Sequence, residues 1–211
     1  MVVGVTGGVG SGKTEFVRAL VRRGATAIDA DRLAHHLVET RAGIRCALRR
    51  AFGPEVFDAH GRVKRRSLGR LVFADPRKRL ELNAILWPPL LAAIRKRICA
   101  LRRADPGCMV VLDMAVLVES GADALVDRVV FVRAPKDRRL AWLAESRGWS
   151  RDESQERMAA QRGDRAQRRR ADVVVQNDGT RKDLRQKAAI FFKYGNAVTR
   201  AKPLAFRKIL L

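Results

Sequence analysis

The sequence predicts an α/β fold in which a parallel sheet carries helices on both faces. Short apolar runs alternate with stretches of helical periodicity along the 211 residues. The runs at 109–113 and 128–132 are continuously apolar, as in strands that are buried on both faces. The length fits a single domain, 1–211, with a sizeable hydrophobic core. We therefore expect a doubly wound sheet with right-handed crossovers.

Two strands and the helix between them are expected within the first 30 residues. Val2–Thr6 is a short apolar run that ends in a glycine-rich turn. Apolar side chains then recur at helical spacing over Lys13–Arg23, and Thr26–Asp29 is the second strand candidate. A helical pattern follows as far as Phe52.

Residues 61–104 contain no convincing strand. Their apolar side chains fall on repeating helical faces, and Asp75-Pro76 has the pattern of an N-cap followed by proline at the first helical position. Between 61 and 103 there are 13 basic and two acidic residues. We expect an inserted helical lobe here, whose functional interpretation is recognition of an anionic substrate.

The sheet resumes after this lobe and ends with Asp172–Gln176 as the last strand, which a helix follows from about Thr180. The basic stretch 136–165 lies before that last strand, and Ser150 and Glu153 have the spacing of a capping box within it. We interpret 136–165 as a lid, because arginines on a mobile lid can meet a transferring phosphoryl group. For any single arginine, a solvated helix face is the competing interpretation.

Composition limits the function classes. Lys plus Arg number 44 against 22 Asp plus Glu, so the formal net charge is +22, which predicts attraction to phosphate-bearing partners. With 47% hydrophobic and 31% charged residues, the chain is not of a disordered type. No apolar run approaches the roughly 18 residues of a membrane span. The three cysteines and three histidines lack metal-site spacing, and no secretory signal is visible, so we expect a cytoplasmic protein.

The most specific motif is Gly7-Gly-Val-Gly-Ser-Gly-Lys-Thr14, which matches G-x-x-x-x-G-K-[ST] between a strand and a helix. In such a P-loop, or Walker A motif, backbone N–H groups surround the phosphates at a helix N-terminus. We expect Lys13 to reach the β- and γ-phosphates of ATP, and the Thr14 hydroxyl to bind Mg²⁺. A chance match to a glycine-rich turn is the alternative, which the strand-to-helix context disfavours. The expected nucleotide-binding residues of this segment are Gly8, Val9, Gly10, Ser11, Gly12, Lys13, Thr14 and Glu15.

Polar residues at the carboxyl ends of the strands mark the ligand-binding edge of such a sheet. Asp29 and Asp31 follow the second strand, Asp113 closes the third, and Asn177 follows the last. Phosphoryl transfer uses a carboxylate to orient the attacking hydroxyl and metal ions to neutralise charge. We expect Asp31 to act as the base, with helix capping as the alternative, and Asp113 to hold Mg²⁺ through water. For Asp29 we expect a helix cap or a supporting role. Two aspartates precede their strands, where a loop or cap role is expected: Asp127 and Asp172.

The order of these motifs resembles that of the dephospho-coenzyme A kinases. The matching segments extend over almost the whole chain: Val5–Thr14, Ile28–Asp31 with Ala34-His35, Gly61–Val63 with Arg66 and Leu68, Val72-Phe73, Trp87-Pro88, Leu117 and Glu119, Gln161, Ala171-Asp172, Asn177 and Gly179. The resemblance implies ATP-dependent phosphorylation of the ribose 3′-hydroxyl of dephospho-coenzyme A, the last step of coenzyme A synthesis. It also implies a nucleotide-kinase-like core, a helical lobe that binds coenzyme A and a mobile lid.

The resemblance assigns roles by position. It implies that Asp31 is the general base, that Lys13 and Thr14 bind phosphate and metal, and that Asn177 lies near the adenine. Arg147 corresponds to a lid arginine with a shift of one residue, and is taken as catalytic. The chain departs from the family pattern at Trp87, where histidine is usual, at Ala115–Glu119, and at Trp142-Leu143, near the other lid arginine; Arg138 or Arg139 is a possible substitute.

Two other interpretations remain open at this point. One is a P-loop kinase that acts on a nucleoside monophosphate or another small alcohol. The other is a basic nucleic-acid-binding protein that uses ATP as a switch, although one tyrosine and few aromatic residues offer little for base stacking. We expect neither a specific nucleic acid nor a membrane as partner, and the sequence does not indicate an oligomeric state.

Overall fold

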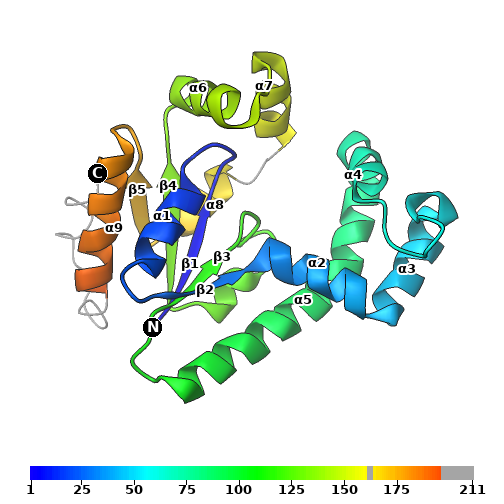
Figure 1. Cartoon of the computed structure of the whole chain (residues 1–211), viewed down its shortest axis with the longest axis horizontal. Helices are drawn as coiled ribbons and strands as arrows, with labels where there is room; N and C mark the ends of the chain where they lie inside the picture. Colours follow the sequence, from blue (N-terminus) through cyan, green and yellow to red (C-terminus); the bar gives the residue numbers. More distant parts are fainter. Residues whose placement is uncertain (161–163, 196–211) are drawn as a thin grey trace. The chain divides into compact units, whose positions relative to one another are not determined.

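The computed structural model describes residues 1–160 and 164–195 (Figure 1). The chain divides into two compact units. One contains Met1–Ile28 and the described residues from Ile98 onward, and the other is Asp29–Arg97. The first unit holds the sheet, and the second is helical.

The first unit is built on a five-stranded sheet with the order β2-β3-β1-β4-β5. The strands are β1 (Val2–Gly7), β2 (Thr26–Asp29), β3 (Val110–Asp113), β4 (Arg128–Arg133) and β5 (Val173–Gln176). Strand β1 pairs in parallel with β3 and β4, and β4 pairs in parallel with β5. The register places Val5 opposite Asp113, so that the carboxyl ends of β1 and β3 are adjacent.

Helices cover both faces of this sheet. Those of the first unit are α1 (Lys13–Val21), η2 (Ala122–Leu125), α6 (Lys136–Arg147), α7 (Arg151–Ala160), α8 (Asp164–Arg170) and α9 (Arg181–Gly195), together with the end of α5. Helices α1 and α9 pack together in a core that includes Val5, Phe16 and Phe191. Side chains alternate along a strand, and the next residue, Thr6, contacts Gln167 of α8. The predicted doubly wound α/β fold is thus confirmed.

Helix α8 is absent from the sequence-based prediction. Five of its seven residues are charged, and it has no apolar stripe that a periodicity search could detect. What it buries is an amide, since Gln167 has no exposed surface. A pattern of apolar residues therefore could not reveal this helix.

The second unit consists of helices. They are α2 (Ala30–Thr40), α3 (Ala42–Phe52), η1 (Pro54–Val56), α4 (Arg65–Ala74) and most of α5 (Pro76–Ala104). The helical character expected for 61–104 is confirmed, and so is the start at Pro76, where Asp75 accepts a hydrogen bond from the Arg77 N–H at 2.8 Å. That this segment binds substrate stays a prediction.

Helices α6 and α7 occupy most of the stretch interpreted as a lid, 136–165, of which residues 161–163 lie outside the described residues. Gln161, which carries part of the family resemblance, is among those three. The Ser150 hydroxyl accepts a hydrogen bond from the Glu153 N–H at 3.1 Å, as the capping-box spacing predicts. Within the part of the chain that the structure describes, no helix combines the length and apolar character needed to cross a membrane.

Candidate active site

The P-loop connects the carboxyl end of β1 to the start of α1, as the motif predicts. Gly10 and Gly12 have φ angles of 74° and 90°, which residues with a Cβ rarely adopt. The Ser11 N–H donates to the Gly8 carbonyl at 3.0 Å, which closes the turn. The Ser11 side chain is 2% exposed, and its Oγ has no hydrogen-bond partner within the described residues. The loop therefore presents a polar atom that a ligand could satisfy.

Lys13 and Asp113 meet at the carboxyl ends of β1 and β3. The Lys13 Nζ donates a hydrogen bond to Asp113 Oδ1, and their side chains are only 17% and 14% exposed. The pairing follows from the strand register, because β1 and β3 are neighbours. The structure thus brings together two residues that are both predicted to serve the nucleotide and its metal.

The donor set near this pair suits Mg²⁺. Thr14 lies exposed in the first turn of α1 and supplies a hydroxyl, and Asp113 supplies a carboxylate. Mg²⁺ is commonly held by one or two carboxylates together with substrate phosphates and water. Residues 1–160 and 164–195 contain no cluster of three or more His, Cys, Asp or Glu side chains able to hold a metal. Such a site would therefore depend on the nucleotide for most of its ligands.

Glu15 follows Thr14 on α1 and pairs with two guanidinium groups. Its Oε1 accepts from Arg185 Nε at 2.7 Å and from Arg22 Nη2 at 3.0 Å. Partial burial raises the pKa of Glu15, but these hydrogen bonds and charges outweigh it and hold the pKa below the ordinary value. Glu15 is therefore an anchored carboxylate, and its contact with a nucleotide stays a prediction.

Asn177 is buried against the P-loop. Its Nδ2 donates to the Ser11 carbonyl at 2.9 Å, and its backbone N–H donates to the Arg133 carbonyl at 2.7 Å. The position near the adenine that the family resemblance implies for Asn177 stays a prediction. The structure adds a direct contact between Asn177 and the P-loop backbone.

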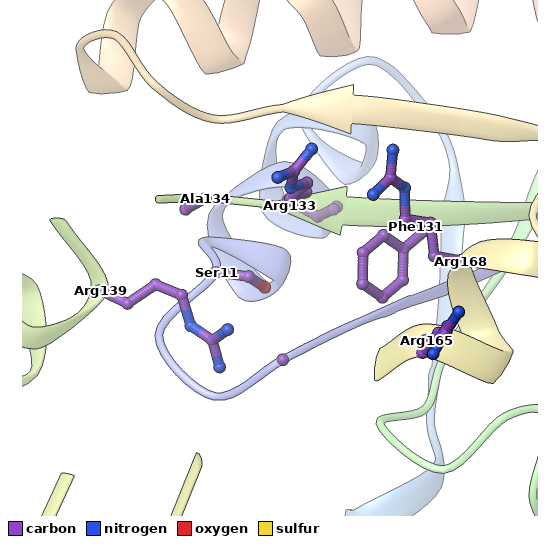
Figure 2. Close-up of a pocket in the computed structure, with 9 residues that line it drawn as sticks. Ser11, Phe131, Arg133, Ala134, Arg139, Arg165 and Arg168 are labelled. Carbon is purple, nitrogen blue, oxygen red and sulfur yellow. The ribbon is translucent and has the colours of Figure 1, made fainter. Parts of the chain in front are cut away.

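A cavity of about 330 Å³ opens beside the P-loop (Figure 2). Nine described residues line it: Gly8, Ser11, Phe131, Val132, Arg133, Ala134, Arg139, Arg165 and Arg168. Arg139 comes from α6, and its Nε donates to the P-loop carbonyl of Val9 at 2.7 Å. Four arginines around one cavity produce a positive potential that favours an anion.

Sequence reasoning did not single out three of these four arginines as pocket residues. Arg133 ends β4, and Arg165 and Arg168 belong to the unpredicted helix α8. Because the chain contains so many basic residues, the presence of an arginine does not by itself indicate a binding site. Only the strand-end position of Arg133 could have indicated a role.

Arg147 lies at the end of α6, outside the set that lines this cavity. Its guanidinium stacks on the Trp149 ring at 4.7 Å from the centroid, and Arg157 stacks on the same ring at 4.1 Å. Such stacking contributes about 0.5–1 kcal/mol at exposed sites. The catalytic role of Arg147 stays a prediction.

Asp29 and Asp31 have different positions at the start of α2. Asp29 is the N-cap and accepts from the Arg32 N–H at 2.9 Å, which confirms the capping role expected for it. Asp31 is exposed in the first turn and belongs to the second unit. Its role as base stays a prediction.

The aspartates at the opposite edge of the sheet have structural contacts, as expected. Asp127 accepts from the Val2 N–H at 2.7 Å and from Arg102 at 2.6 Å. Burial raises the pKa of Asp127, and these two contacts lower it to a net value below the ordinary one. Asp172 accepts from the Val129 N–H at 2.8 Å.

Comparison with known proteins agrees with this geometry. A family model described as dephospho-CoA kinase matches residues 1–183. A dephospho-CoA kinase of Frankia casuarinae is 41% identical over 182 residues, which cover 86% of this chain and 78% of that protein. Another, from Corynebacterium diphtheriae, is 37% identical over 188 residues, covering 89% and 93% of the two chains.

Solved structures show the same fold. TT1252 from Thermus thermophilus superposes with a TM-score of 0.76 at 31% identity, over 92% of this chain and 97% of that one. Dephospho-CoA kinase from Campylobacter jejuni gives 0.68 at 21% identity, over 92% and 98%. A shikimate kinase from Acinetobacter baumannii gives 0.53 at 16% identity, over 93% and 94%, a likeness of fold alone.

The match to the family model includes the P-loop, the Lys13–Asp113 pair and Asn177. The alignments with the two relatives cover more than three quarters of the length of each relative. This chain belongs to the dephospho-CoA kinase family, a family of ATP-dependent kinases.

Proposed function

We propose that this protein transfers the γ-phosphoryl group of ATP to the ribose 3′-hydroxyl of dephospho-coenzyme A, giving coenzyme A and ADP. The observation that carries the proposal is the P-loop, whose Lys13 meets Asp113 at adjacent strand ends, in a chain whose family match extends over residues 1–183.

On the nucleotide side, the backbone N–H groups between Gly8 and Lys13 bind the phosphates, and the Lys13 ammonium neutralises charge on the β- and γ-phosphates. Thr14 and Asp113 are the residues that would hold Mg²⁺, Asp113 through water. When bound, Mg²⁺ supplies charge neutralisation at the phosphates. Asn177 keeps the loop in shape through the Ser11 carbonyl.

On the acceptor side, we assign the base to Asp31. A bond forms between the 3′-oxygen and the γ-phosphorus while the bond from that phosphorus to the β,γ-bridging oxygen breaks. The hydroxyl proton passes to the Asp31 carboxylate, and ADP leaves with the bond electrons. The segment 61–104 would bind the rest of dephospho-coenzyme A, whose phosphates suit its basic surface.

The lid, 136–165, would exclude water during the transfer and bring an arginine to the transferring group. Arg147 is the candidate from the family pattern. Arg139 is a second candidate, because it contacts the P-loop carbonyl of Val9.

We further propose a cytoplasmic location, because all three cysteines, Cys46, Cys99 and Cys108, are free thiols.

The test is an ADP-release assay with ATP and Mg²⁺ in which the acceptor is varied. We expect turnover with dephospho-coenzyme A that exceeds both the rate without acceptor and the rate with nucleoside monophosphates. If folded protein releases ADP only with a nucleoside monophosphate, the acceptor proposed here is wrong and the nucleoside monophosphate takes its place. Folded protein without turnover on any acceptor would contradict the kinase activity itself.

A further inference from the structure

The amide of Gln167 is a buried junction in the first unit. Gln167 has no exposed surface. Its Nε2 donates to the Ala115 carbonyl at 2.9 Å and to the Glu119 carboxylate at 2.9 and 3.1 Å. Its Oε1 accepts a hydrogen bond from the Thr6 hydroxyl. Both ends of the amide are therefore satisfied.

The three partners of this amide belong to segments that lead to the phosphate site. Thr6 immediately precedes the first glycine of the P-loop motif, and its one hydroxyl proton is shared between Gln167 Oε1 and the Ala115 carbonyl, which lies 3.1 Å from the Thr6 oxygen. Ala115 and Glu119 follow β3, which ends at Asp113. One side chain thus connects α8 with the entrance to the P-loop and with the segment after Asp113.

Helix α8 carries two of the arginines that line the cavity beside the P-loop. Arg165 precedes Gln167 by two residues and Arg168 follows it directly; both line the cavity with Gly8 and Ser11 (Figure 2). Arg170, at the end of the helix, pairs with Asp123 at 2.8 Å, but its own side chain is 67% exposed.

A seven-residue helix with five charged residues cannot be placed by an apolar face. Gln167 is the one buried residue within 165–170, so we attribute the docking of α8 chiefly to Gln167, with the Arg170–Asp123 pair at the end of the helix. An apolar side chain of similar size would fill the space but leave the Thr6 hydroxyl and the Ala115 carbonyl with fewer partners.

We propose that Gln167 is a positioning residue that holds α8 so that Arg165 and Arg168 face the cavity beside the P-loop. The inference rests on the proposed function, because these arginines act on catalysis only if the phosphates of the reactants occupy that cavity. Gln167 itself has no role in the chemistry.

The first test is Gln167→Ala, with Gln186→Ala as its control on the exposed surface of α9. A misplacement of about 1 Å at a phosphoryl-transfer site can cost about 100-fold in rate. We expect Gln167→Ala to lower kcat by about tenfold or more while the protein still melts cooperatively, and Gln186→Ala to keep the wild-type rate.

A double-mutant cycle separates positioning from a general loss of stability. When Arg165 and Arg168 are both replaced by alanine, the further change Gln167→Ala should alter kcat by less than about twofold. A full, additive loss in that background would mean that Gln167 acts independently of the two arginines.

The second test adds a carboxyl beside Glu119 through Gln167→Glu. Of the side chains that contact Gln167, Glu119 is titratable and Thr6 is not. Strand β4 also packs on α8 and brings Arg133 to the cavity, and α8 itself carries Arg165, Arg168 and Arg170. Two neighbouring carboxylates cannot both ionise without cost.

The variant Gln167→Glu should therefore work best at low pH, where the added carboxyl is protonated and can donate to Glu119. As the pH rises, the added carboxyl ionises and repels the Glu119 carboxylate, so kcat should fall along a limb that the wild type lacks. Adding Glu119→Gln removes the second carboxylate and should abolish this limb. The shape of the pH profile is a readout that lost packing alone would not change.

The outcomes are distinct. If wild-type protein shows no turnover with dephospho-coenzyme A, the proposed function fails. The role of Gln167 is then tested by the affinity for a non-hydrolysable ATP analogue. If neither Gln167→Ala nor Gln167→Glu changes this affinity, the role of Gln167 is wrong. If wild-type protein is active and both variants keep its kcat at every pH, the role of Gln167 is wrong. If Gln167→Ala does not fold, the pH profile of Gln167→Glu with and without Glu119→Gln decides.

Discussion

The Asn177 side chain donates to the Ser11 carbonyl at 2.9 Å, although the two residues are 166 positions apart in the chain. A Cβ on the neighbouring Gly12 would lie 2.2 Å from Asn177 Nδ2. The amide therefore fits only because position 12 has no side chain. The glycine of the motif serves the backbone conformation of the loop and also its contact with the end of β5.

We predict that Asn177→Ala loosens the phosphate loop. A buried carbonyl that loses its donor costs about 1–3 kcal/mol, so both the melting temperature and the affinity for ATP should fall, with the KM for ATP rising by about tenfold. Asp178→Ala is the control, because Asp178 is exposed and its pair with Lys187 spans 3.6 Å. Calorimetry and initial rates measure both effects, and equal results for the two variants would contradict the positioning role.

Asp113→Asn should weaken the use of Mg²⁺. It keeps the shape of the side chain but removes the charge that pairs with Lys13. Loss of a group that holds a metal through water typically lowers the affinity for the metal by about 10–100-fold. The Mg²⁺ concentration for half-maximal rate should therefore rise by at least about tenfold. Asp127→Asn, at the opposite edge of the sheet and also paired with a cation, should leave it unchanged. A shift of similar size in both variants would refute the metal assignment.

Asp31→Asn should reduce kcat by about 10²–10⁴-fold, the usual range for loss of a general base. The KM for ATP should stay near the wild-type value, because the assigned role is on the acceptor. Asp29→Asn is the matched control two residues earlier, since asparagine caps a helix as well as aspartate does. Steady-state rates for both variants distinguish the roles, and a near-normal kcat for Asp31→Asn would remove Asp31 from the mechanism.

Arg147 and Arg157 stack on the same Trp149 ring, which offers a direct comparison. If Arg147 leaves the ring to meet the transferring group, Arg147→Ala should lower kcat by up to about 10³-fold. Arg157→Ala should keep kcat within a few-fold, because Arg157 has no assigned role in the transfer and its surface ion pair with Glu153 is worth little. The same small loss in both variants would show that Arg147 acts on Trp149 alone.

The fold could be predicted because short, local sequence patterns determine its main elements. The continuous apolar runs that became β3 and β4, and the P-loop between β1 and α1, are short segments whose residues determine their own structure. An aspartate that follows a strand lies at the opposite edge of the sheet from one that precedes a strand. Asp113 and Asp127 could therefore be assigned to opposite edges from the sequence. Each of these inferences needs only neighbours in the sequence.

What could not be predicted depends on contacts between distant residues. Gln167 is buried because Thr6 and Glu119 complete its hydrogen bonds, and none of the three is unusual in its own segment. Arg139 contacts the P-loop across 130 positions. In a chain with a net charge of +22, the arginines of a site cannot be told from the others by composition.

The position of the new phosphate on the product tests the central claim most directly. ATP, Mg²⁺ and dephospho-coenzyme A would be incubated with the purified protein, and the product examined by ³¹P NMR with coupling to the ribose protons. We predict a new phosphomonoester signal coupled to the 3′ proton, formed in equal amount with ADP. ADP formed without any new phosphomonoester, or a phosphate on another oxygen, would contradict the account.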